Sequence, residues 1–223
     1  MQKYLIIVEG VADAVFIRDC IYHANEKNEK FIQSSKIGKF SKGKPNKIAE
    51  APEIKILNAG GCKHIKEYKT KIIEAFDINY ELIVIQDADN PLKDPDTGGT
   101  KKRMVFLESI KKEFNIEFET FLFPNNKDNG DLETLLLQIV NKEKFKKSFD
   151  CYKKYADCVK FFSEEKHSNE LLEDKYKVYN YFRTYHGMEN AKEENREYKS
   201  EYWDFSNDAI MIFLNFLERV IMI

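Results

Sequence analysis

Acidic side chains stand at the ends of apolar segments that have the composition of buried strands. They are Glu9 after residues 4–8, Asp87 and Asp89 after 82–85, and Asp131 and Glu133 after 121–123. Carboxylates held close together repel one another, and one of them takes up a proton unless a cation compensates the charge. Mg²⁺ binds oxygen ligands, keeps several waters and bridges protein carboxylates to substrate phosphates. The pattern therefore predicts a Mg²⁺ site, which Mn²⁺ could also occupy, provided that the fold brings these ends together.

The elements expected to position these acids alternate between strand and helix four times. Strands are predicted at 4–8, 54–58, 81–89 and 117–124, each followed by a segment whose apolar residues recur at helical spacing. The runs 4–8 and 82–85 are continuously apolar, as expected when helices cover both faces of a parallel sheet. The sequence therefore predicts an α/β fold with a mostly parallel four-stranded sheet flanked by helices, similar to a Rossmann fold.

In an open parallel sheet, ligands bind beyond the carboxyl ends of the strands. Neighbouring strands lie about 4.8 Å apart. Glu9 and the pair Asp87 and Asp89 would share one site if the first and third strands are adjacent.

The residues around these acids resemble a known family. "VEGVAD", with Glu9, Gly10 and Asp13, and "QDAD", with Asp87 and Asp89, resemble the motifs of the Toprim domain. Topoisomerases, bacterial primases, ribonucleases that mature ribosomal RNA and the overcoming-lysogenization-defect nucleases share this domain. The match is best to small, mostly uncharacterised Toprim-like bacterial proteins, which have a similar "GG" turn, here Gly60–Gly61, and a "G-x-L-E" segment, here Gly130–Glu133. The resemblance covers roughly residues 1–140.

The resemblance implies a role for each matching residue. Glu9 is implied as the general acid or base of phosphoryl transfer, Asp87 and Asp89 as Mg²⁺ ligands, and Glu133 as the residue that completes the metal shell. Contacts to phosphate or substrate are predicted for five further residues, namely Gly10, Asp13, Gly60, Gly61 and Lys63. No tyrosine is marked as a topoisomerase nucleophile and no primase zinc module is present, which disfavours those two branches.

The function predicted on this basis is Mg²⁺-dependent phosphodiester chemistry on DNA or RNA, most simply that of a nuclease. A second hypothesis is a non-catalytic Toprim-like module that binds a metal–nucleotide ligand or a partner protein. A receiver-like phosphoacceptor would also place acids at strand ends. It ranks third, because no convincing lysine follows a late strand.

Each motif also has a purely structural interpretation. An acid after a strand is commonly a turn or helix-cap residue, and Asp13 would favour the N-terminus of its helix electrostatically. Gly60–Gly61 either brings the backbone close to a phosphate, with Lys63 and His64 at a helix N-terminus, or forms only a tight turn.

Two basic stretches are candidates for contact with a nucleic-acid backbone. The segment "KIGKFSKGKPNK" belongs to a lysine-rich insertion predicted at about 27–52, for which a solvated loop is the favoured interpretation. The segment "TKKR" ends the loop 90–103 and would bring Lys101, Lys102 or Arg103 towards a phosphate.

Composition limits the class of protein. The chain has 223 residues, a formal net charge of −2, and 43% hydrophobic and 33% charged residues, which disfavours a basic nucleic-acid coat protein. Its four cysteines and four histidines show no zinc spacing. The N-terminal residues do not resemble a signal peptide, and the last apolar run is too short to cross a membrane. These features predict a cytoplasmic protein with reduced thiols and no membrane partner.

The strand–helix alternation stops after about residue 140. The sequence therefore predicts a Toprim-like domain at 1–140 and a C-terminal helical extension at 141–223 that folds back on it. The aromatic stripes of this extension, for example Phe145, Phe149 and Tyr152, have helical spacing. Such stripes are more often core than a stacking surface for bases. The oligomeric state is not indicated by the sequence.

Overall fold

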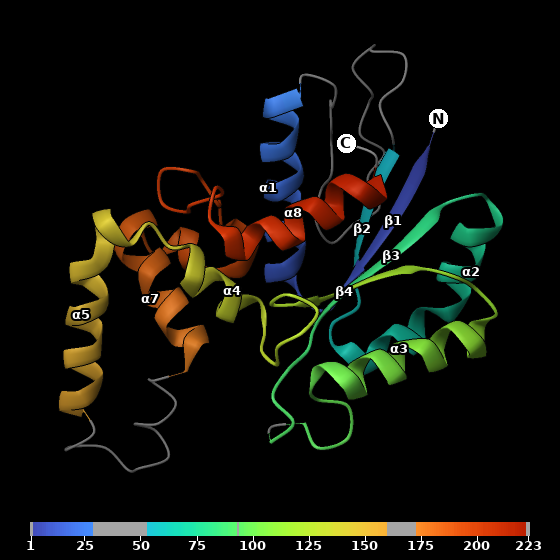
Figure 1. Ribbon diagram of the computed structural model, residues 1–223, viewed down its shortest axis with the longest axis horizontal. Coiled ribbons are helices and arrows are strands. Elements are labelled where there is room, and N and C mark those ends of the chain that lie inside the picture. The colour runs from blue at the N-terminus through green and yellow to red at the C-terminus, as the bar shows by residue number, and fades with distance from the viewer. Residues whose placement is uncertain (1, 29–52, 93, 160–172, 222–223) are drawn as a thin grey trace.

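A four-stranded sheet forms the centre of the molecule. The computed structural model describes residues 2–28, 53–92, 94–159 and 173–221. The strands are β1 (Lys3–Val8), β2 (Glu53–Asn58), β3 (Glu81–Asp87) and β4 (Glu119–Phe123). All three pairings are parallel and the order is β2-β1-β3-β4 (Figure 1). The predicted α/β class and parallel sheet are confirmed.

Helices cover both faces of this sheet because its strands are apolar on both sides. One face carries α1 (Val11–Asn28), α4 (Leu132–Ile139) and α8 (Asp208–Ile221). The other carries the 3₁₀ segment η1 (Cys62–Tyr68) followed by α2 (Lys69–Asp77), and α3 (Thr100–Phe114). Alternate residues of β1 enter the two cores: Tyr4, Ile6 and Val8 enter the first, and Leu5 and Ile7 the second. This alternation is the strand period of two.

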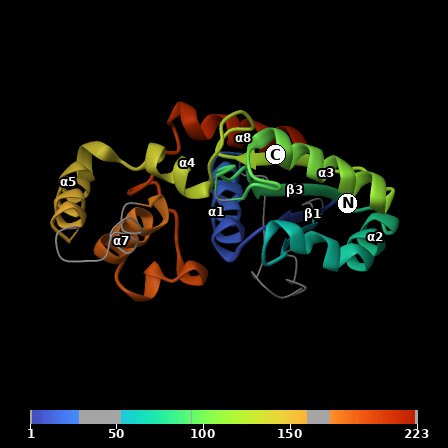
Figure 2. The same cartoon turned by 90° about the horizontal axis from the view of Figure 1, so that it is seen from below.

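The chain after α4 is helical, as predicted. It contains α5 (Lys142–Val159), α7 (Asp174–His186), and the short 3₁₀ segments η2 (Glu189–Ala191) and η3 (Glu193–Asn195). Figures 1 and 2 show α5 and α7 beside the sheet, beyond α1 and α4.

The last helix returns to the sheet and joins the two parts of the molecule. Phe213 of α8 packs on Phe16 of α1 and on Phe121 and Phe123 of β4, with ring centroids 4.9–5.9 Å apart. The same buried cluster continues to Trp203 and Phe182, so one apolar core extends across residue 140. A domain boundary at that residue stays a prediction.

Two further expectations concern the lysine-rich insertion and the absence of a membrane-spanning helix. The lysine-rich insertion expected at 27–52 lies outside the described residues, except for the end of α1 at Asn28. Within the described ranges, no helix has both the length and the apolar character that crossing a membrane requires.

Candidate functional site

The first and third strands are neighbours, which is the condition that the predicted site requires. Val8 at the end of β1 is in register with Ile85 of β3, and Asp87 at the end of β3 is in register with Phe123 of β4. Since the strands are parallel, Glu9 and Asp87 leave the sheet at the same edge.

The turn from β1 to α1 is fixed by one of the predicted site residues. The Asp13 carboxylate lies in the first turn of α1 and accepts a 2.7 Å hydrogen bond from the Gly10 backbone N–H. A side chain at Gly10 would place its Cβ 3.3 Å from the same carboxylate oxygen. Asp13 is only 5% exposed. Its position thus supports the structural interpretation of a turn-fixing acid. It also places a buried carboxyl group within electrostatic range of Glu9.

The loop after β3 is tied to the loop after β4, and this connection positions both aspartates. Asp87 Oδ1 accepts a 2.9 Å hydrogen bond from the backbone N–H of Leu132, the first residue of α4. Asp89 has a left-handed backbone, with φ 60°, and its N–H donates to the Gly130 carbonyl at 2.6 Å. Aspartate is one of the few residue types that tolerate this conformation. The two carboxylates are therefore held by backbone that is fixed on both sides.

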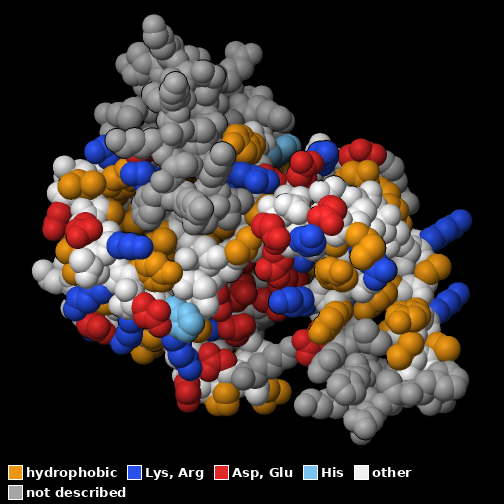
Figure 3. All heavy atoms as spheres, turned by 180° about the vertical axis from the view of Figure 1, so that it is seen from behind, with side chains coloured by type: hydrophobic (Ala, Val, Ile, Leu, Met, Phe, Trp, Pro, Cys, Tyr) orange, Lys and Arg blue, Asp and Glu red, His pale blue; other side chains and the backbone are white. Residues whose placement is uncertain are grey.

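Five carboxylates gather at this edge and form what we call the acidic cluster, consisting of Glu9, Asp13, Asp87, Asp89 and Glu133. Burial is the main cause that raises the pKa of Glu9, and the negative charge of Asp89 raises it further. Burial is also the main cause that raises the pKa of Asp87 well above its usual value, and the negative charges of Asp13, Glu9 and Glu133 raise it further. These mutual effects place the side chains within electrostatic range of one another. Figure 3 shows acidic side chains lining a hollow between the sheet and the helical part.

A buried arginine lies beside the acidic cluster. The Arg103 side chain is 0% exposed, is ion-paired with Asp89, and has Nη2 3.7 Å from Asp94. Its positive charge lowers the pKa of Glu9 and so offsets part of the effect of Asp89.

The buried place of Arg103 differs from the expectation that this residue reaches a phosphate. Helical spacing gives the reason, because Arg103 precedes Leu107, Ile110 and Phe114 on the buried side of α3. The same spacing could have predicted it. Lys101 and Lys102 point outwards, and Lys102 Nζ donates to the Pro95 carbonyl at 2.5 Å.

The double glycine lies at the same edge, at the end of β2. Gly60 and Gly61 have φ values of 78° and 141°, which favour glycine, and the Gly60 N–H donates to Asn58 Oδ1 at 2.9 Å. Lys63 is half exposed, with its Nζ 3.7 Å from Asp94 and 3.5 Å from Asp96. These residues follow the carboxyl end of β2, and Lys63 pairs with two aspartates of the loop that follows Asp89.

The helical part, the chain after α4, places near the acidic cluster charged side chains that were not predicted from the sequence. The pKa of Glu133 is raised mainly by burial and lowered by the positive charges of Arg196 and Lys175. The negative charge of Glu193 in turn raises the pKa of Asp13. Residues about 40 to 180 positions apart thus come within electrostatic range of one another, and no local pattern in the sequence indicates this proximity.

The acidic cluster has the donor chemistry of a site for a hard cation. Glu9 Oε2 is buried without a hydrogen-bond partner among the described residues, and burial of an unsatisfied carboxyl oxygen is unfavourable. Within the same residues, no group of three or more His, Cys, Asp or Glu side chains could hold a metal ion by itself. Mg²⁺ commonly uses only one or two carboxylates and completes its shell with waters and substrate phosphates. A site of that kind fits the aspartates after β3.

The fold and the cluster define a parallel α/β protein with an acidic site at the carboxyl edge of its sheet. The chain belongs to a protein family of unknown function, DUF3226, whose model matches residues 3–222. Neither the curated proteins nor the solved structures include a match to the chain.

Proposed function

We propose that the protein is a Mg²⁺-dependent phosphodiesterase of Toprim type that acts on nucleic acid, with the acidic cluster as its catalytic site. One observation carries the proposal. Five carboxylates share the carboxyl edge of a parallel sheet, and one of them, Glu9, has a buried oxygen without a hydrogen-bond partner among the described residues. Arg103 and backbone hydrogen bonds of Asp87 and Cys62 compensate the Glu9 carboxyl only in part, because burial and Asp89 still raise its pKa, and a purely structural set of caps and turns would not need such a group.

Asp87 and Asp89 are the residues proposed to hold Mg²⁺, with waters and a substrate phosphate completing its shell. Glu133, which the resemblance implies as a further ligand, raises the pKa of Asp87 by its charge but forms no three-carboxylate metal group with the aspartates among the described residues. When bound, the cation would polarise the phosphate and neutralise charge that develops on it. Asp87 is fixed by the N–H of Leu132 and Asp89 by Arg103, so neither carboxylate needs to be ordered when the ion arrives. The resemblance of "VEGVAD" and "QDAD" to Toprim motifs supports the same assignment.

Glu9 is the residue proposed to move the proton. Its pKa is raised by burial and by Asp89, which brings a carboxyl group closer to the range where it can both accept and donate a proton near neutral pH. Glu9 would then transfer a proton to or from the attacking or leaving oxygen of the phosphodiester. Arg103 opposes too large an increase in that pKa.

The test is cleavage of labelled single- and double-stranded DNA and RNA in Mg²⁺, Mn²⁺ or EDTA. The proposal predicts metal-dependent cleavage by the wild type and its loss in Asp87→Asn. Asp77→Asn is the matched control, because Asp77 is exposed at the end of α2, next to the amino end of β3. Tight metal-dependent nucleotide binding without cleavage would instead support the non-catalytic module. Equal cleavage in EDTA and in Mg²⁺ would refute the role of the metal.

A further inference from the structure

A cavity in the helical part has in its wall Arg196, whose charge acts on Glu133 of the acidic cluster. It has a volume of about 440 Å³ and lies between α5, α7 and the η2–η3 segment. This is within the range of roughly 300–1,000 Å³ that is typical of small-ligand sites. Three tyrosines line it, namely Tyr155, Tyr176 and Tyr179. Aromatic rings in such a cavity offer flat faces on which a nucleobase can stack.

The charge of the cavity is mainly positive. Its four cationic side chains are Lys175, Arg183, Lys192 and Arg196, against one acid, Glu193. Lys175 and Lys192 are partly compensated, since their Nζ atoms lie 3.6 Å from Glu193 and 2.9 Å from Glu189. The two arginines have no ion pair with a carboxylate of the described residues. They are the groups best suited to an anion.

Arg196 is the most informative of these residues. Its side chain is only 2% exposed, and Nε and Nη1 have no hydrogen-bond partner among the described residues. The guanidinium lies 5.1 Å from the centre of the Phe182 ring, which holds it in place. A buried and incompletely satisfied guanidinium is costly. Its retention beside a cavity is explained if a ligand supplies hydrogen-bond acceptors for Nε and Nη1.

The wall of the cavity is joined to the helix that begins at the acidic cluster. Arg18 Nη2 of α1 donates to the Arg196 carbonyl at 3.3 Å, and the Tyr198 N–H donates to Asp19 Oδ2 at 2.8 Å. Arg196 also faces Glu133 closely enough to lower its pKa. A chain of phosphates that enters the acidic cluster from this side would pass Arg196.

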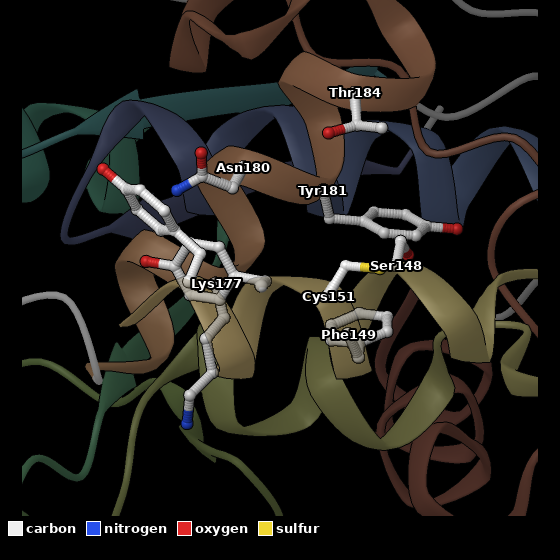
Figure 4. A pocket seen from close by; sticks show the side chains of 9 residues that line it. Ser148, Phe149, Cys151, Lys177, Asn180, Tyr181 and Thr184 are labelled. Carbon is white, nitrogen blue, oxygen red and sulfur yellow. The ribbon is translucent and has the colours of Figure 1, made fainter. Parts of the chain in front are cut away.

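A neighbouring cavity shows that aromatic lining alone does not make such a site. It has a volume of about 330 Å³ and lies between α5 and α7 (Figure 4). It shares Tyr155 and Asn180 with the first cavity. Phe149 and Tyr181 are stacked there with centroids 5.5 Å apart, and its only cation, Lys177, is paired with Asp174 at 2.8 Å. This second cavity is a gap in helix packing, and none of its described lining residues is an unpaired cation that could bind a phosphate.

We propose that the cavity of Tyr176, Arg183 and Arg196 holds one unpaired nucleotide of the substrate, with its base against tyrosine and its phosphate on the arginines. The inference rests on the proposed function and specifies its substrate class. A base in a duplex is already paired and stacked, so only a single strand or an extruded base can offer a free face. The protein is therefore expected to prefer single-stranded nucleic acid.

The experiment measures binding by fluorescence anisotropy of a labelled single strand and of its duplex, in EDTA so that no metal-dependent cleavage occurs. The single strand should bind about tenfold more tightly than the duplex. Tyr176→Ala should weaken single-strand binding by about 5- to 150-fold, the loss expected for one stacked base. Arg183→Gln should weaken binding and lower the salt dependence by about one phosphate contact. Both residues are exposed on α7, so their replacement should not prevent folding.

Two variants serve as matched controls. Tyr22→Ala removes an exposed tyrosine of α1, and Lys153→Gln an exposed cation of α5 that does not line either cavity. Unchanged binding in Tyr176→Ala and Arg183→Gln, or equal affinity for strand and duplex, would overturn the inference even if the wild type cleaves. Loss of binding in these two variants alone would support it, even if cleavage is never observed.

Discussion

Replacement of Glu9 by glutamine separates the catalytic role of this residue from a structural one. The wild-type carboxyl has a buried Oε2 without a partner in the described part of the chain, and it faces the charge of Asp89. Leaving a buried acceptor unsatisfied costs about 1–3 kcal/mol. A glutamine amide has the same shape, carries no charge and can donate to a neighbouring carboxylate. In EDTA, Glu9→Gln should therefore raise the free energy of unfolding by about 1–3 kcal/mol.

The assay is urea unfolding of the wild type and the variant, first in EDTA and then in excess Mg²⁺. For a chain of this length each kcal/mol shifts the melting temperature by about 2–4 °C, so a thermal melt provides a second readout. Mg²⁺ should stabilise the wild type more than the variant, because the variant has already lost part of the repulsion. Cleavage by Glu9→Gln should fall about 10²–10⁴-fold.

Glu67→Gln is the matched control, since Glu67 is exposed on η1. Its stability should change by no more than about 0.5 kcal/mol. A Glu9→Gln variant that is less stable than the wild type in EDTA would show that the carboxylate is needed for folding. That result would refute the reasoning, as would full activity.

Three further predictions concern the surroundings of the site. The raised pKa values of Glu9, Asp13, Asp87 and Glu133 mean that the folded state binds more protons than the unfolded state at pH values between the usual 3.8–4.5 and the pKa values in the folded state. In EDTA, the free energy of unfolding measured with urea should therefore increase as the pH falls from above the folded-state pKa values towards 4.5. A decrease over that pH range would contradict the raised pKa values. Arg103→Met should lower the free energy of unfolding, measured with urea, by about 1–3 kcal/mol. This is less than the 3–5 kcal/mol expected when a fully buried ion pair is broken, because Asp89 is one-third exposed. An unchanged midpoint of urea unfolding would show that the ion pair contributes nothing to stability. Gly130→Ala should lower the free energy of unfolding by about 1–3 kcal/mol, because its φ is 146° and a Cβ would lie 2.8 Å from Thr134 Oγ1. Gly187→Ala is the control for backbone strain alone, because Gly187 has a φ of 83° and open space around it.

The sheet and the shared edge of the acids could be predicted because local patterns determine them. The continuous apolar runs of β1 and β3 indicate strands covered on both faces, and acids just beyond such strands must leave at the carboxyl edge. The buried stripes of α3 and α8 follow from helical spacing alone.

The contacts between distant segments could not be predicted in this way. The left-handed backbone of Asp89 depends on its bond to Gly130, and the sequence shows neither the pairing nor the conformation. Arg196 reaches Glu133 only because η3 packs on α1. The cavity beside Arg196 likewise depends on how α5 and α7 pack, and the aromatic stripe of α5 favours a core over a stacking surface when the sequence alone is considered.

Titration of Mn²⁺ into the metal-free protein by calorimetry determines whether the acidic cluster is a metal site. The double variant Asp87→Asn/Asp89→Asn removes two formal charges from the proposed ligands, and Asp77→Asn removes one from an exposed position near the opposite edge of the sheet. The account predicts one-site binding to the wild type and to Asp77→Asn, and an affinity at least about tenfold weaker in the double variant. Equal affinity in all three proteins would contradict it.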